Sequence, residues 1–340
     1  MPSTGPGSEQ RGQMESGGPT AAAWGRTRDR TPEDQCCGLS VETIGRQSQG
    51  WELLLDAEAS ASTWTEFWTS QGANAHCMQD ASPALWRPLE EHWNSLASRL
   101  PPRTRVLDLG CGAGVVGRML LAARPELQVV GIDLATIPHV ERGMTILSGI
   151  AMEELPFAAA SFGAAVSQFG YEYGDPERAA PELARVLSRG APLSLVAHHS
   201  DSSILAKSRS RMQAQALLLG EAMRAAVLAG DVAGFGTQAA NLQAAHGDDP
   251  LISECLRLLR PHLYRGEMQR LQAWNALGNA LSLGIEINRQ LERSSLTPQR
   301  LERHLSILSG YFSLAQPAVI TRNDTGEPVA YRIEGVRRNC

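Results

Sequence analysis

Three glycines and two aspartates at fixed spacing are the residues of this chain best suited to chemistry. Gly110, Gly112 and Gly114 follow the short apolar run 106–109 and precede the apolar, helix-compatible run 115–123. A strand, a turn without side chains and a helix in that order let a nucleotide-like ligand approach the backbone closely. The helix N-terminus beyond the turn presents unpaired N–H groups and a partial positive charge.

The two aspartates restrict which ligand this turn can hold. Asp108 stands two residues before the first glycine, where a carboxylate would repel a pyrophosphate and attract the ammonium of an amino-acid moiety. Asp133 ends the next strand-like run, about 20 residues after the last glycine, as expected for an acid that holds ribose hydroxyls. Together they favour S-adenosyl-L-methionine over NAD. Because Gly112-x-Gly114-x-x-Gly117 also fits the dinucleotide spacing, an NAD-dependent oxidoreductase is an alternative.

Four sequence blocks resemble a known family. Residues 106–114, VLDLGCGAG, resemble motif I of the class I S-adenosylmethionine-dependent methyltransferases. Three further blocks, in the right order, resemble the branch that includes ubiquinone- and menaquinone-biosynthesis methyltransferases, with a methyltransferase type 11-like domain. They are LPF at 155–157 with Ser161-Phe162, AVSQF at 165–169 and ELARVLSRG at 182–190. The resemblance implies a Rossmann-like, doubly wound α/β fold with a mostly parallel sheet, methyltransferase activity and S-adenosyl-L-methionine as cofactor.

Composition limits the class of protein and its partners. A chain of 340 residues allows one large domain with an insertion, or two smaller ones. A net charge of −5, with acids and bases interspersed, gives no general attraction to nucleic acid or anionic membranes. The six cysteines show no zinc-ligand spacing, so we expect no metal, and nothing demands disulfides. No apolar run reaches membrane-spanning length. We therefore expect a soluble, cytoplasmic protein without membrane insertion.

The order of the patterns predicts five segments. We expect a disordered tail at 1–48, an N-terminal helical lid at 49–100, the S-adenosylmethionine-binding core at 101–202, a helical insertion or cap at 203–310, and a C-terminal β-hairpin at 311–340 that completes the sheet with an antiparallel edge. The insertion either caps the crevice or forms a helical bundle through which the chain makes a homodimer.

The cofactor site is expected at the carboxyl ends of the strands. The predicted cofactor-binding residues are Asp108, Gly110, Cys111, Gly112, Gly114, Asp133, Leu134, Ala151, Met152 and Gln168. The sequence departs from the family where relatives carry an acid for the adenine amino group, since Ala151, or Ile150 with a one-residue gap, stands there. Adenine would then rest on apolar contacts and backbone groups, with Glu153 nearby. This loss keeps open a second alternative, a non-catalytic binding or regulatory module.

A second departure concerns the connection after the second strand. Only residues 134–142, with Pro138 among them, precede the next strand-like run, so the usual crossover helix is expected to be shortened or lost. That corner is then either open or covered by another element.

The catalytic candidates follow the fourth and fifth strands. Tyr171, with Glu172 and Tyr173, is placed near the transferring methyl group, and His198 and His199 end the run 193–197 at the same rim. A histidine there can act as a general base, or can simply hydrogen-bond a loop carbonyl. The acceptor is expected to be a small molecule, because no basic, aromatic-interleaved surface favours nucleic acid.

Aromatic residues before the core are the last candidates. Trp64, Phe67 and Trp68 stand at i, i+3 and i+4, which predicts one face of a helix. In a lid they could attract the sulfonium by cation–π contact; the alternative is ordinary helix packing.

Overall fold

The computed structural model describes residues 59–70, 82–138, 143–247 and 249–339. The chain divides into two compact units, 1–50 and 51–340, and all the described residues belong to the second. The predicted disordered tail at 1–48 lies outside the described residues.

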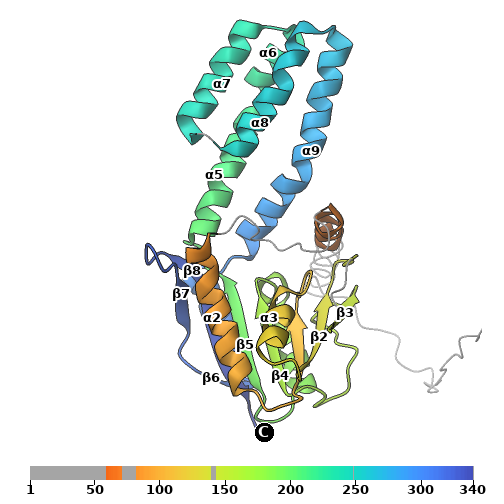
Figure 1. Ribbon diagram of the computed structural model, residues 1–340, viewed down its shortest axis with the longest axis vertical. Coiled ribbons are helices and arrows are strands. Elements are labelled where there is room, and N and C mark those ends of the chain that lie inside the picture. Colours follow the sequence, from red (N-terminus) through yellow and green to blue (C-terminus); the bar gives the residue numbers. More distant parts are fainter. Residues whose placement is uncertain (1–58, 71–81, 139–142, 248, 340) are drawn as a thin grey trace, which may run out of the picture. The chain divides into compact units, whose positions relative to one another are not determined.

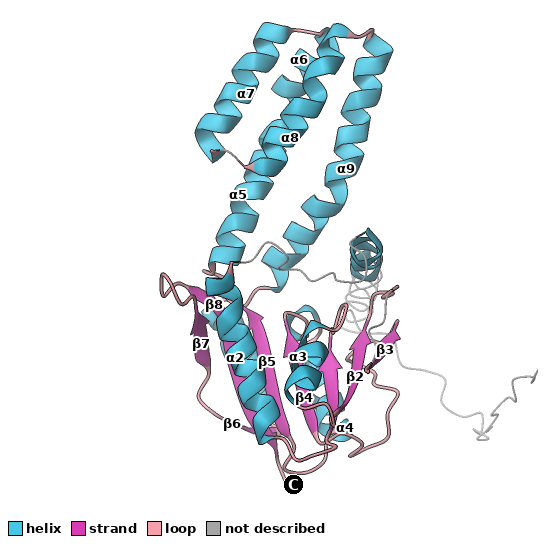
Figure 2. Cartoon of the chain, in the orientation of Figure 1, coloured by secondary structure: helices cyan, strands magenta, loops and turns pink. Residues whose placement is uncertain are grey.

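Eight strands in the described part of the chain form one mixed sheet (Figure 2). They are β1 (Arg105–Leu109), β2 (Gln128–Asp133), β3 (Thr145–Ser148), β4 (Ala164–Gln168), β5 (Pro192–His198), β6 (Phe312–Leu314), β7 (Ala318–Thr321) and β8 (Pro328–Arg337). The order is β3-β2-β1-β4-β5-β8-β6, with β7 also paired to β8. Strands β1 to β5 are parallel, and β6 to β8 pair antiparallel. The predicted α/β fold with an antiparallel C-terminal edge is confirmed.

Helices flank and interrupt the sheet. Helix 59–70 is followed by α2 (Pro83–Arg99), α3 (Val115–Ala123), η1 (Tyr171–Tyr173), α4 (Pro176–Val186), α5 (Ser203–Leu218), α6 (Glu221–Ala229), α7 (Val232–His246), α8 (Pro250–Leu259), η2 (Arg260–Tyr264), α9 (Glu267–Ser294) and α10 (Pro298–Ser309). Three of them begin with a capping side chain followed by proline, a pattern in the sequence that predicts a helix start: Asp175, Asp249 and Thr297 each accept a hydrogen bond from a first-turn N–H.

The sheet buries an apolar core on each face. Residues of β1 alternate between the two: Val106 packs in the core formed with α2 and α3, which includes Trp93. Leu107 packs in the core formed with α4 and α10, which includes Leu183. Figure 1 shows α2 and α3 lying across one face of the strands. Both faces are therefore covered, which explains why these strands are continuous apolar runs.

The helices α5 to α9 are inserted between β5 and α10 and have an apolar core of their own, which includes Phe235, Leu242 and Trp274. Within the described ranges, no helix combines the length and the apolar composition that crossing a membrane requires.

The C-terminal edge contains one strand more than the expected hairpin. β7 and β8 form that hairpin, with an irregularity between Ile320 and Thr321. β6 pairs with the end of β8, from Gly335 to Arg337. Because β6 has only three residues, it shows no alternation that a sequence pattern could reveal.

Helix 59–70 covers the corner after β2, where the described residues of the connection, 134–138, form no helix. Residues 134–138 are not helical, yet β2 and β3 are parallel. Trp68 packs with Ala135 and Ile137 from this connection. The N–H of Thr136 also donates to Oγ1 of Thr65 at 2.9 Å. Of the two outcomes expected for this corner, the structure shows the covered one.

Candidate cofactor and catalytic site

The glycine turn after β1 has the backbone that only glycine adopts easily. Gly110, Gly112 and Gly114 have φ values of 59°, 49° and 81°, and Gly114 is the N-cap of α3. A Cβ on Gly110 would lie 2.8 Å from Cα of Gly170, so the turn lies directly against the loop that follows β4. Cys111, predicted to line the cofactor, is buried, and burial raises the pKa of its thiol. It packs against Gly131 as a small apolar residue.

Asp108 is a buried carboxylate with no hydrogen-bond partner on either oxygen among the described residues. It is 1% exposed and lies at the carboxyl end of β1. Burial raises its pKa to about 8; the nearby N–H of Gly117, which does not reach hydrogen-bond geometry, opposes the rise, and the charge of Asp133 adds to it. A buried carboxyl group that the protein leaves unpaired is costly for stability and is suited to receive a cationic group of a ligand.

Asp133 lies across the turn from Asp108 and stays partly accessible. Its Oδ2 accepts the N–H of Gly112 at 2.8 Å, and its Oδ1 accepts the N–H of Ala135 at 2.9 Å. Burial raises its pKa to about 6, and these two backbone donors oppose the rise. The carboxylate thus ties the glycine turn to the loop after β2, and its remaining lone pairs can accept hydroxyl hydrogen bonds.

Aromatic rings connect the glycine turn to the end of β5. Trp68 lies against Gly112, so closely that a Cβ there would collide with its ring. Trp64 stacks on Trp68 with centroids 6.3 Å apart and meets Tyr173 edge-on at 5.7 Å. Tyr173 in turn meets the ring of His198 edge-on at 6.4 Å. Helix 59–70 therefore lies against the predicted cofactor turn and is linked to His198 through the ring of Tyr173.

His198 is held by a buried glutamate. Its Nδ1 lies 2.8 Å from Oε1 of Glu172, and its own backbone N–H donates to the same oxygen at 2.9 Å. The Glu172 side chain is fully buried and that of His198 is 7% exposed. The ring of Phe169 stacks on His198 at 4.0 Å. Sequence reasoning placed Glu172 in this region without a role, because its pairing with a histidine 26 residues away leaves no local pattern.

The other two catalytic candidates point elsewhere. The ring of His199 stacks on Tyr331 at 4.2 Å, and its Nδ1 accepts the N–H of Asp201 at 3.0 Å. Burial lowers the pKa of His199. Tyr171 is 1% exposed in the core beside α4, with its ring edge-on to His304. Burial raises the pKa of its hydroxyl. The structure thus brings His198 to the glycine turn and places His199 and Tyr171 away from this group.

The remaining predicted cofactor residues are spread along the rim. Leu134 is 39% exposed after β2, and Ala151 and Met152 are half-buried in the loop after β3. Gln168, at the end of β4, accepts a hydrogen bond from the indole N–H of Trp93 at 2.6 Å. Glu153 accepts the N–H of Asp175 at 2.7 Å, so one of its oxygens is committed to the start of α4.

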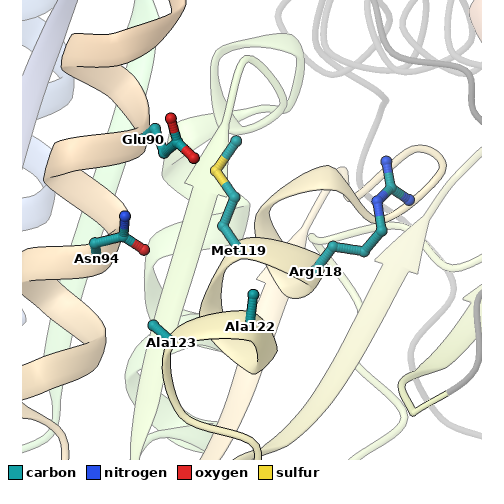
Figure 3. Close-up of a pocket in the computed structure, with 6 residues that line it drawn as sticks. All are labelled: Glu90, Asn94, Arg118, Met119, Ala122 and Ala123. Carbon is teal, nitrogen blue, oxygen red and sulfur yellow. The ribbon is translucent and has the colours of Figure 1, made fainter.

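A groove of about 540 Å³ between α2 and α3 lies apart from this rim. Figure 3 shows Glu90 and Asn94 of α2 facing α3, with Met119 between the helices and Arg118 pointing away from α2. None of its lining residues follows the carboxyl end of a strand, so the groove is separate from the candidate site.

The fold and the site together define a class: an α/β domain with a glycine turn flanked by two carboxylates at the carboxyl ends of its strands. Residues 107–195 match the family model described as a methyltransferase domain. This segment is therefore a methyltransferase domain, and the recognition made from motif I and the three later blocks is confirmed.

Several known proteins are similar to this chain. It is 36% identical to a malonyl-[acyl-carrier protein] O-methyltransferase of Herminiimonas arsenicoxydans over 105 residues. This matched segment covers 29% of this chain and 39% of that relative. It is 32% identical over 117 residues to the ubiquinone/menaquinone biosynthesis C-methyltransferase UbiE of Syntrophotalea carbinolica, covering 31% and 49% respectively. The chain thus spans less than two thirds of the length of these relatives.

Among solved structures, the 1,6-didemethyltoxoflavin-N1-methyltransferase of Burkholderia thailandensis aligns with a TM-score of 0.40 at 12% identity, covering 89% of this chain and 93% of that one.

Proposed function

We propose that this chain is an S-adenosylmethionine-dependent methyltransferase that acts on a small-molecule acceptor. The observation that carries the proposal is the unpartnered, buried Asp108 beside the glycine turn. The donor set fits the cofactor: a carboxylate for the ammonium, Asp133 for the ribose hydroxyls, and glycines that leave room for a close backbone approach. A pyrophosphate offers no cationic group to Asp108 and would oppose the ionisation of this carboxyl group, which counts against the NAD alternative.

When bound, S-adenosylmethionine supplies an activated methyl group on a sulfonium. The chain's own part is to hold two reactants in line and to exclude water, which can lower the barrier by several kcal/mol. We assign the binding to the segment 101–202, the covering role to 49–100, the cap to 203–310 and the completion of the sheet to 311–340. Helix 59–70, with Trp64 and Trp68, is the part of this cover that the structure describes.

The names of the relatives point to different classes of methyl acceptor. One is named for a malonyl-acyl-carrier-protein substrate and another for a quinone pathway. A third, over only 47 residues, is named as a ribosomal RNA small subunit methyltransferase of Shewanella sediminis. The net charge of −5 favours a small molecule over RNA. We also propose that α5 to α9 can mediate homodimerisation, which sedimentation of the full chain and of a variant lacking 203–294 would test.

Titration calorimetry with S-adenosylmethionine and with NADH tests the cofactor assignment. We expect binding of the first at micromolar concentrations and none of the second. No heat at millimolar S-adenosylmethionine would favour a non-catalytic module. Transfer of a labelled methyl group to small-molecule extracts, with total RNA as the parallel arm, then tests the acceptor class.

A further inference from the structure

We propose that Glu172 and His198 form a base dyad, in which Glu172 positions the ring and His198 accepts the proton of a conjugated hydroxyl acceptor such as a phenol or an enol. The inference rests on the proposed function and adds to it a positioning residue, a proton acceptor and an acceptor class. His198 belongs to the predicted catalytic residues, whereas Glu172 was given no role by the sequence.

The hydrogen bonds fix which ring nitrogen can act as a base. A carboxylate only accepts hydrogen bonds, so the contact of 2.8 Å with Oε1 of Glu172 places a proton on Nδ1 of neutral His198. The lone pair is then on Nε2, which has no hydrogen-bond partner among the described residues. The His198 side chain is 7% exposed, and its Nε2 is not fully enclosed. This tautomer gives Nε2 the lone pair that a general base requires.

The neighbouring histidine has the opposite arrangement. In His199, Nδ1 accepts the backbone N–H of Asp201, so the proton of the neutral ring lies on Nε2. The free nitrogen of His199 is therefore a donor. This contrast assigns the base to His198 alone, although the two residues are adjacent in the sequence.

The surroundings of the dyad cost folding free energy that a purely structural element would not require. The second carboxylate oxygen of Glu172 is enclosed and has no partner among the described residues. Arg300 of α10 is near enough to interact with this carboxylate electrostatically, while its N–H groups bond backbone carbonyls. Beneath the ring, Phe169 has a φ of 59°, which is strained for a residue with a large side chain. Strain and unpaired buried groups gather where function requires them.

The dyad adjoins the cofactor turn. Phe169 precedes Gly170, whose backbone contacts Gly110 of the turn. The ring of Phe169 stacks on His198, and the edge of Tyr173 faces it. Aromatic walls around one accessible base favour a flat acceptor that carries an ionisable hydroxyl.

The step balances without any further reactant. The hydroxyl proton passes to Nε2 of His198 as the oxygen lone pair forms the new O–CH₃ bond. The S–CH₃ bond breaks, and its electron pair stays on sulfur to give the neutral thioether. The charge of Glu172 stabilises the imidazolium that forms.

The test combines ring-nitrogen NMR with kinetics on phenols of increasing acidity: phenol, 4-chlorophenol and 4-nitrophenol. The variants are E172Q, H198A and, as a control, E182Q. Glu182 also accepts a backbone N–H, but its side chain pairs with Arg185 and not with a histidine. At alkaline pH we expect His198 to carry its proton on Nδ1 in the wild type and in E182Q, and to lose this preference in E172Q.

In kinetics, E172Q and H198A should lower kcat on phenol by about 100-fold with KM changed less than about threefold, as for a lost general base. The loss should shrink on 4-nitrophenol, which is largely ionised already. Calorimetry with S-adenosylmethionine on each variant checks that the fold is retained. A proton on Nε2 in the wild type, full kcat in E172Q, or methylation of none of the phenols by a protein that binds S-adenosylmethionine would overturn the dyad. Absence of binding in the wild type would instead remove the proposed function.

Discussion

Replacing Asp108 by asparagine should stabilise the protein and weaken its binding of S-adenosylmethionine. The pKa of this carboxyl is 3.8 in its ordinary state and about 8 in the fold. Because the folded value is the higher one, its contribution to stability is complete below pH 3.8 and is lost as the pH rises toward 8. At pH 7 the linkage relation gives a penalty of about 4 kcal/mol. An amide avoids it but leaves a buried N–H₂ group unpaired, at about 1–3 kcal/mol.

The net gain expected for D108N at pH 7 is therefore roughly 2 kcal/mol, a rise of several degrees in Tm that should vanish at about pH 5 and become a loss at about pH 4. Loss of the charge opposite the ammonium should cost about 2.7 kcal/mol, or 100-fold in Kd. Since Asp108 is mostly protonated at pH 7 when unliganded, binding to the wild type should also release nearly one proton.

Two assays measure these effects. Urea unfolding at pH 4 and pH 7 gives the stability, and calorimetry in buffers of different ionisation enthalpy gives Kd and the protons released. D201N, which alters an exposed aspartate, is the control and should match the wild type in both. Equal affinity in D108N and wild type, or binding without proton release, would refute the assignment of Asp108 to the ammonium.

Three further predictions concern other parts of the molecule. W68A should keep its fold and bind S-adenosylmethionine about tenfold more weakly, since it loses an aromatic face at the turn; unchanged calorimetric affinity would remove the lid role of this ring. G112A should lower Tm by several degrees and weaken binding, because its Cβ meets Trp68 and its φ is 49°, whereas G236A, with open space around it, should not; equal Tm values would contradict this. Burial lowers the pKa values of His92 and His304 to about 4, below the ordinary 6.5. Each should therefore remove about 2 kcal/mol from the free energy of unfolding between pH 7 and pH 5, because the unfolded chain takes up a proton that the folded chain does not. In urea unfolding, H92Q and H304Q should show a shallower dependence of this free energy on pH, and a dependence equal to the wild type's would exclude the effect.

The sequence predicted those features that depend on local chemistry. The glycine turn needs side-chain-free residues at set positions, and the helix starts at Asp175 and Thr297 need a cap followed by proline. Both features depend on residues that are consecutive in the chain, so the sequence shows them directly. The mostly parallel sheet with an antiparallel C-terminal edge followed from the family resemblance and from buried apolar runs.

Features that depend on distant contacts could not be predicted in this way. Glu172 and His198 meet only because β4 and β5 are neighbours in the sheet. The adjacent His198 and His199 look equivalent in sequence, and only their hydrogen-bond partners distinguish them. Likewise, nothing in the chain indicated that Trp68 would cover the shortened connection after β2.

A crystal structure of the complex with S-adenosylhomocysteine tests the central claim most directly. We predict that the ligand lies on the turn 110–114, with its amino group within hydrogen-bonding distance of Asp108 and its ribose hydroxyls on Asp133. A ligand bound at another place, or one that touches neither carboxylate, would contradict it.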